Sequence, residues 1–432
     1  MRPIVTSGLA ALVVGTAVPA LAAEAVTYSG TLGTLPVVVE LVRPDEGGDV
    51  SIGRYAYISK GIDIPLHGGG EGGLTLTEEA PCTAALCAGP DGLAREDGVY
   101  PVGATWQLRS EGDGTRLSGS WTKAGSGQSL PVSLERRGAR SVEETDYAPF
   151  DALDPQSALF TETGSDEPSF GRLPFDVLKM EAPLEAGAEE RLGEGVYRLD
   201  RDPRIGLAFP TVLSIGRADV APIDAFLAAE RLSSSLSSFS CLSRTYLGMG
   251  WSGQAGEGSN GFEPPEAGNV VVDHLSERLM GFTESGSFYC GGAHPDNYTI
   301  HTLADVSTGA RLEPETLLRG WTATDADGNP VDPTASGVDP DTLTWGPDAA
   351  LADFVRTKRK RFDADVEGGC SLDDFIGTNL AVFFRQDSLV FTLDGLPHAL
   401  QACQDDLLVV PLAEARDLLT EDGARYFAVL DR

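Results

Sequence analysis

The first part of the chain alternates apolar and polar residues over short runs that are separated by glycine-rich turns. Residues 26–42 alternate and then fill with branched side chains, and the runs SIGRYAYI and GLTLTEEA continue the pattern. Alternation with a period of two places every second side chain on one face of a β-strand. Residues 24–138 are therefore predicted to form an all-β domain, built as a meander or open barrel.

The pattern changes after this segment. Residues 139–184 are acidic and carry prolines, serines and threonines without a sustained period, which predicts a linker. Residues 185–432 mix element types, because residues 222–239 and 347–361 have helical spacing whereas shorter runs alternate like strands. Separate runs of strands and helices favour an α+β domain with a mainly antiparallel sheet and two to three helices. The predicted fold class is thus two domains, all-β and then α+β.

The N-terminus has the layout of an export signal. Arg2 supplies a positive charge, Ile4–Val18 form a largely apolar stretch, and Ala20-Leu21-Ala22 offers the small residues that signal peptidase needs. Residues 1–22 are therefore expected to be a signal peptide, which predicts a periplasmic or extracellular location. No later run reaches the roughly 18 apolar residues of a membrane helix, so no membrane span is expected after cleavage.

Acidic residues outnumber basic residues by 65 to 32, which gives a formal net charge of −33. A field of this sign keeps a protein soluble, repels nucleic acid and attracts cationic proteins. A nucleic-acid partner is therefore not expected. Simple solubility or a salt-rich habitat explains the charge as well, so the charge is compatible with a cationic partner without requiring one.

Six cysteines in a chain expected to reach an oxidising compartment predict disulfide bonds. Six cysteines allow fifteen sets of pairings, so the sequence alone does not choose among them. Order along the chain suggests the pairs Cys82–Cys87, Cys241–Cys290 and Cys370–Cys403. No CxxC pair occurs, so neither a structural zinc site nor another metal or cofactor is expected.

The most unusual short motif runs from Tyr289 to Asp296, with the sequence YCGGAHPD. Two glycines after a cysteine permit a sharp reversal, and a residue before proline is pushed to an extended conformation. One interpretation is a turn that a disulfide at Cys290 holds in place. The other is a binding role, for which the candidates are Tyr289, Gly291, Gly292, His294 and Asp296.

No catalytic residue is assigned. Neither HExxH nor GxSxG occurs, which excludes the common zincin helix and the nucleophile elbow. A hydrolase that uses His294 with a nearby carboxylate stays open, because catalytic triads are assembled in space. The aromatic residues of the first domain are interpreted as core, with a sugar- or peptide-binding face as the alternative. They are Tyr55, Tyr57, Trp106 and Trp121.

The run FYCGGAHPDNYTIHTLADVSTGARLEPETLL, residues 288–318, is similar to the signature of the RsiV-type C-terminal domain family. That domain is found in the anti-sigma factor RsiV and beside the deacetylase domain of PdaC-like proteins. The resemblance covers about residues 185–432 and implies an extracytoplasmic α+β module. RsiV uses this domain to sense and bind lysozyme, a strongly basic protein. The chain lacks the transmembrane helix, the sigma-binding segment and the deacetylase domain of those proteins, so neither signalling nor deacetylation is carried over.

These observations lead to three functional hypotheses. The leading one is a non-catalytic periplasmic or secreted binding protein whose partner is a cationic protein such as lysozyme or an envelope polymer. The second is an envelope hydrolase built on His294. The third is a structural envelope protein without a ligand.

Overall fold

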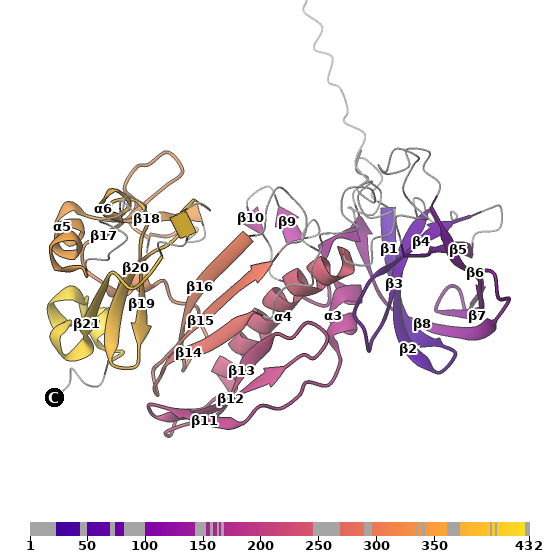
Figure 1. The fold of residues 1–432 in the computed structure, drawn as a ribbon, viewed down its shortest axis with the longest axis horizontal. Helices are drawn as coiled ribbons and strands as arrows, with labels where there is room; N and C mark the ends of the chain where they lie inside the picture. The colour runs from indigo at the N-terminus through magenta and orange to yellow at the C-terminus, as the bar shows by residue number, and fades with distance from the viewer. Residues whose placement is uncertain are drawn as a thin grey trace, which may run out of the picture.

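The structure is a computed structural model of the chain. Its described residues are 23–43, 50–69, 74–81, 100–142, 153–155, 159–161, 164–165, 168–244, 268–288, 296–333, 335–338, 342–360, 372–397, 400–401 and 404–427. Within them it is mostly β, with one eight-stranded barrel, several small antiparallel sheets and five helices. Figure 1 places the barrel at one end of the molecule and the C-terminal sheets at the other.

The N-terminal strands form a closed antiparallel barrel in which each strand pairs with the next in sequence. The strands are β1 (Ala23–Leu32), β2 (Leu35–Arg43), β3 (Ile52–Tyr57), β4 (Ile64–Gly68), β5 (Thr75–Glu79), β6 (Val102–Glu111), β7 (Arg116–Lys123) and β8 (Ser129–Val142). The predicted meander is confirmed, whereas the open barrel is wrong, because β8 pairs with β7 at one edge and with β1 at the other and so closes the sheet. A Cβ on Gly30 would lie 2.0 Å from the Ser133 carbonyl oxygen, so closure depends on a glycine there.

The inside of the barrel is an apolar core with one carboxylate in it. Tyr55 and Trp106 are fully buried, as predicted, and their rings meet edge to face at 4.9 Å. Glu78 is 7% exposed and accepts hydrogen bonds from three of the surrounding aromatic side chains. The donors to its Oε2 are Tyr55 Oη at 2.9 Å, Trp106 Nε1 at 3.1 Å and Trp121 Nε1 at 2.7 Å. A buried carboxylate is thus satisfied by neutral donors from three strands.

One helix of the segment after the barrel packs against the outside of the barrel. Helix α3 (Pro174–Met180) lies inside the expected linker, and its Phe175 and Leu178 pack on Val38 and Ala56 of the outer barrel surface. Strand β8 also continues beyond residue 138, to Val142. Part of the segment expected to be a linker is therefore packed against the barrel.

A buried set of charges lies between the barrel and α3. Arg54 donates to three carboxylates: Glu40 Oε2 at 2.8 Å, Asp63 Oδ2 at 3.0 Å and Asp176 Oδ2 at 3.0 Å. Lys179 Nζ lies 2.8 Å from Asp63 Oδ1. All five side chains are buried. They are called the Arg54 cluster below, and they join β2, β3, the β3–β4 connection and α3.

Further cations complete this interface. Burial alone would raise the pKa of Glu40, but the charges of Arg140 and Arg54 outweigh it and lower that pKa to about 2. Helix α4 (Ala221–Arg244) reaches the same region, where Ser243 Oγ accepts the backbone N–H of Asp63 at 3.1 Å. The guanidinium of Arg204 lies 4.5 Å from the centre of the Phe239 ring, also on α4. The interface is therefore polar in its centre and closed by aromatic rings.

The second half holds the remaining elements. Its antiparallel sheets are β11 (Glu189–Leu192), β12 (Gly195–Arg201) and β13 (Ala208–Ile215); β14 (Asn269–Leu275), β15 (Leu279–Phe288) and β16 (Asp296–Asp305); β17 (Trp321–Thr324) and β18 (Thr344–Pro347); and β19 (Leu380–Arg385), β20 (Ser388–Leu393) and β21 (Leu408–Pro411). A small sheet of β9 (Phe160–Thr161) and β10 (Gly164–Ser165) precedes them. The helices are α5 (Ala349–Lys358), α6 (Leu372–Phe375) and α7 (Glu421–Ala424), with 3-10 turns η3 (Pro314–Leu317), η7 (Leu412–Glu414) and η8 (Arg416–Leu418).

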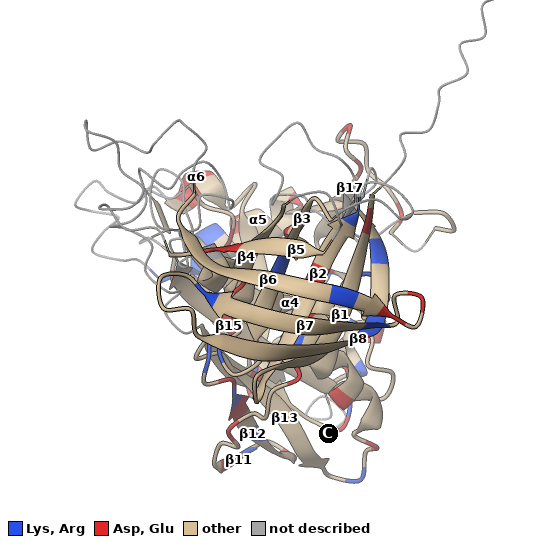
Figure 2. Cartoon of the chain, turned by 90° about the vertical axis from the view of Figure 1, so that its right-hand side faces the viewer, with Lys and Arg blue, Asp and Glu red and all other residues tan. Residues whose placement is uncertain are grey.

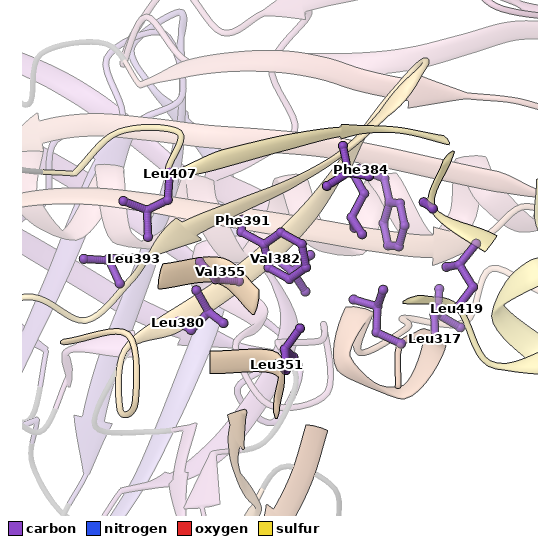
Figure 3. Close-up of a cluster of buried hydrophobic side chains, with 14 of the residues drawn as sticks. Leu317, Leu351, Val355, Leu380, Val382, Phe384, Phe391, Leu393, Leu407 and Leu419 are labelled. Atoms are coloured by element: carbon purple, nitrogen blue, oxygen red, sulfur yellow. The ribbon is translucent and has the colours of Figure 1, made fainter. Parts of the chain in front are cut away.

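Two apolar cores hold these sheets in place. In the first, α4 contributes Ile223 and Leu227 against Phe209 of β13 and Phe282 of β15. The second core belongs to the C-terminal sheets, and Figure 3 shows its side chains, among them Val355 of α5 beside Val382 and Phe391. Strands β14, β15 and β16 pack on the first core through one face. Part of their other face packs on the second core and on β19, and the rest of that face is left for a site.

Within the described residues, no helix combines the length and the apolar composition needed to cross a membrane. Cys241 on α4 is the cysteine that these residues include, and it is in a disulfide bond. The other five cysteines lie outside the described residues, so the three suggested pairings stay predictions.

We expect Arg54→Met to lower the free energy of unfolding by about 3–5 kcal/mol, because it leaves buried carboxylates without their cation. The measurement is urea unfolding followed by tryptophan fluorescence. Arg136→Met is the matched control, since Arg136 pairs with Glu24 at 3.3 Å where both side chains are exposed, and its loss should be far smaller. Similar unfolding midpoints for the two variants would contradict a stabilising role of the Arg54 cluster.

Candidate binding cleft

A cleft with a volume of about 1030 Å³ lies on the face of β14–β16 that is turned away from the first core. Strand β19 contacts all three of these strands, and the connection after β20 completes the cleft. The lining residues are mostly hydroxyl, amide and carboxylate side chains. They include Asn269, Asp273, Thr283, Ser285, Ser287, Asn297, Thr299, His301, Arg385, Gln401, Gln404, Asp405 and Asp406.

Strand alternation explains why this face is polar. On β14, Val270 and Val272 point into the first core, which leaves Asn269 and Asp273 on the other side. On β15, Phe282 points into the core, and its neighbour Thr283 lines the cleft. A run of small polar residues on one face of three strands therefore produces the lining.

Three of these residues form a hydrogen-bonded relay across the three strands. The Thr283 hydroxyl donates to Asp273 Oδ2, and its oxygen lies 2.7 Å from His301 Nδ1. A hydroxyl has a single hydrogen and an ionised carboxylate only accepts, so His301 Nδ1–H donates to the threonine oxygen. This fixes the imidazole in its Nδ1–H tautomer and leaves Nε2 as an acceptor.

The surroundings of the relay favour a neutral histidine. Burial lowers the pKa of His301 to about 4, and the Phe383 ring stacks on the imidazole with centroids 3.9 Å apart. Burial also raises the pKa of Asp273, although the hydrogen bond from Thr283 opposes this effect. His301 is therefore uncharged near neutral pH and acts as a polar, oriented ring.

The cleft carries a surplus of negative charge. Its lining contains three carboxylates, Asp273, Asp405 and Asp406, against one guanidinium. That guanidinium, Arg385, is held by both oxygens of Asp406 at 2.6 and 3.0 Å. Asp405 accepts its neighbour's backbone N–H at 2.7 Å and has no cationic partner among the described residues. Asp405 and Asp273 are thus the groups that can attract a cation.

Most of the residues proposed from the sequence fall outside the part of the chain that the structure describes. Tyr289, Gly291, Gly292 and His294 lie outside the described residues, and Asp296 is described only as the first residue of β16. Their segment joins β15 to β16, the two strands that place Ser287 and Asn297 in the cleft. The motif is thus next to the candidate site in the chain, and its binding role stays a prediction.

Sequence reasoning missed Asp273, Thr283 and Arg385. The alternating sequence around each residue predicts a strand. The pairing of β14, β15 and β16, which brings these residues together, depends on contacts between distant parts of the chain and does not follow from the local sequence. In the barrel it missed Glu78, whose only signal is an acidic residue at an inward position of the run LTLTEE. A carboxylate at an apolar position of an alternating strand is a usable signal for a buried polar site.

No protein-family model matches the chain, and no curated protein matches it. The similarity of residues 185–432 to the RsiV-type domain family therefore stays a prediction from the motif. Among the described residues, no group of three or more His, Cys, Asp or Glu side chains is placed to share a metal ion.

We expect His301 to titrate near pH 4, well below the usual value of about 6.5 for histidine. Since the folded-state pKa is the lower one, this histidine should reduce stability progressively as pH falls from about 6.5 to about 4. The measurement is an NMR titration of histidine side-chain nitrogens, with His301→Gln to assign the signal.

The same spectra test the relay. Thr283→Val removes the acceptor of Nδ1–H, so the fraction of the Nδ1–H tautomer should fall while the fold is retained. A wild-type signal of the Nε2–H tautomer, or a midpoint near 6.5, would contradict the proposed hydrogen bonds.

Proposed function

We propose that this protein is a periplasmic or secreted binding protein whose cleft on β14–β16 takes a cationic segment of a partner protein. The observation that carries the proposal is the acidic lining of a cleft large enough for several side chains, in which the single guanidinium is already neutralised. Lysine and arginine side chains are the ligands that unpaired carboxylates prefer. Hydroxyl and amide groups beside them supply further hydrogen bonds to a peptide backbone.

Long-range charge supports the same partner. A net charge of −33 would steer a basic protein toward the molecule at low ionic strength. The barrel is a poorer docking surface for such a partner, because the outer faces of β6 and β7 carry mostly uncharged residues (Figure 2). The cleft is therefore the favoured place for the contact.

The resemblance to the RsiV-type domain suggests one partner by name. RsiV binds lysozyme, and a lysozyme or another cationic muramidase is the proposed partner of this chain. In this proposal the chain has two domains, with the barrel supporting the second domain through α3 and the Arg54 cluster. Residues 1–22 are proposed to direct export and then to be removed.

A hydrolase is the second candidate, because Asp273, Thr283 and His301 resemble the parts of a proton relay. His301 replaces His294 in this version, since its Nε2 acceptor would take a proton from an attacking water. A general base works best when its pKa lies near the working pH, and a pKa of about 4 makes His301 a weak base at neutral pH. Binding is therefore the better supported function.

Lysozyme binding is expected at low salt and should weaken as salt screens the charges. Asp405→Asn should weaken it by about 2–5-fold, the usual size of one partly exposed charge contact. Isothermal titration calorimetry with the purified chain measures both effects. Asp327→Asn is the control with the same charge change, on an exposed turn outside the cleft. Equal affinities of the two variants, or no binding at low salt, would rule out the cleft as the lysozyme site.

The hydrolase candidate is tested on purified peptidoglycan. If it were correct, His301→Gln would reduce the release of soluble fragments by about 10²–10⁴-fold, the usual contribution of general base catalysis. We expect no release by the wild-type chain, and a release that depends on His301 would overturn this expectation.

A further inference from the structure

Strand β16 is the last strand of its sheet. It pairs with β15 on one side and with no further strand of the described residues on the other, an order that can be followed in Figure 1. Near its C-terminal end the outer side is taken up by the chain that follows, since Leu312 N donates to the Leu303 carbonyl oxygen at 2.8 Å. In the same register Pro314 comes opposite His301, and proline has no N–H to continue the pairing. The chain then turns into η3 and leaves the edge.

The alternation of the ladder shows which backbone groups of β16 point outward. Along an antiparallel strand, the N–H and C=O groups of every second residue point to the same side. Leu303 points its carbonyl group away from β15, and the pairing of β15 with β16 has no register shift. The backbone groups of His301 and Thr299 therefore point outward too. Neither has an outward backbone partner within the part of the chain that the structure describes.

Asn297, two residues before Thr299, already makes the kind of contact that an added strand would make. Its outward carbonyl oxygen accepts a hydrogen bond from Gln401 Nε2 at 3.3 Å. A side-chain amide thus takes the place of a backbone N–H at this point. The unpaired part of the edge lies between this contact and the pairing at Leu303.

The side chains of this unpaired part differ between the two faces of the sheet. Thr299 and His301 line the acidic cleft, whereas Ile300 between them points to the opposite face and is 50% exposed. An exposed apolar side chain on an unpaired edge strand is a template for the addition of another strand. A strand placed here would cover Ile300 with one side chain and send the two neighbouring side chains into the cleft.

We propose that the cationic segment of the partner binds as an extended strand, added antiparallel to the edge of β16. Its residues opposite Thr299 and His301 exchange backbone hydrogen bonds with them, the usual source of affinity in strand addition. These two residues point into the cleft, whose carboxylates favour lysine or arginine. The residue between them covers Ile300 and is apolar. This inference rests on the proposed binding function and adds the conformation and the sequence pattern of the bound segment.

The test uses the full-length chain with ¹⁵N-labelled histidine and the peptide acetyl-Ser-Thr-Lys-Val-Lys-Thr-Ser-amide. NMR spectra follow the backbone amide of His301, which His301→Gln assigns. The peptide should shift this amide signal saturably, with a Kd of about 1 mM or tighter. At about ten times the Kd, hydrogen exchange of the same amide should slow by about 10-fold, because only the free chain leaves it open to water.

Two methylated peptides separate backbone pairing from charge attraction. Methylation of both lysine amide nitrogens removes the donors that face β16 and should weaken binding by about 5–100-fold, the size of two net hydrogen bonds. Methylation of the valine amide nitrogen is the matched control, since this nitrogen points away from β16 and its loss should change the Kd by less than about 2-fold. Both peptides keep the same charge.

A pair of chain variants tests the edge itself. Ile300→Lys should weaken peptide binding by about 3–10-fold, because it removes the apolar contact and lysine protects edge strands against pairing. Val409→Lys is the control, since Val409 is 46% exposed on β21 and lies outside the cleft. It should leave the Kd unchanged.

Equal affinities of the two methylated peptides would overturn strand addition, as would a His301 amide signal that does not move at about 10 mM peptide. These outcomes are distinct from failure of the proposed function. If lysozyme still bound and Asp405→Asn still weakened it, the cleft would hold its partner through side-chain charge alone.

Discussion

A buried guanidinium has to be surrounded by carboxylates, because moving an isolated charge out of water costs far more than the stability of a whole domain. Arg54 meets this requirement with Glu40, Asp63 and Asp176, which come from β2, from the β3–β4 connection and from α3. If helix α3 separated from the barrel, Arg54 would lose Asp176 as a partner and Asp63 would lose Lys179. Ser243 and Phe239 of α4 close the same region, so the long helix is positioned by this constraint as well.

The position of the cleft follows from that attachment. Helix α4 packs on β13 and on the inner faces of β14–β16, which fixes one side of the sheet against apolar side chains. The other side receives β19 and its aromatic and cationic residues, Phe383 and Arg385. A polar cleft is stable there because its groups are satisfied mainly by each other, as in the Arg385–Asp406 pair.

Local features of the sequence predicted the local features of the structure. The alternating runs gave the meander of the barrel, and Tyr55 and Trp106 are core residues as expected. Closure of the barrel was not predictable in the same way, since it depends on a pairing between β1 and β8, more than one hundred residues apart. The relay of Asp273, Thr283 and His301 was missed for the same reason, because a register shift in β14 decides which side chains meet.

The β-bulge at Asp273 of β14 also affects how the cleft can change over evolution. Asp273 lines the cleft at a point where β14 contains one residue more than its partner strand, because Val272 pairs with Phe282 and His274 pairs with Gly281. The arrangement is thus encoded by the length of the strand as much as by the identity of its residues. Exchanging the side chain at position 273 changes one contact of the cleft, whereas deleting this residue would restore the regular alternation between Val272 and Leu275 and also remove the extra backbone unit that the bulge adds to β14.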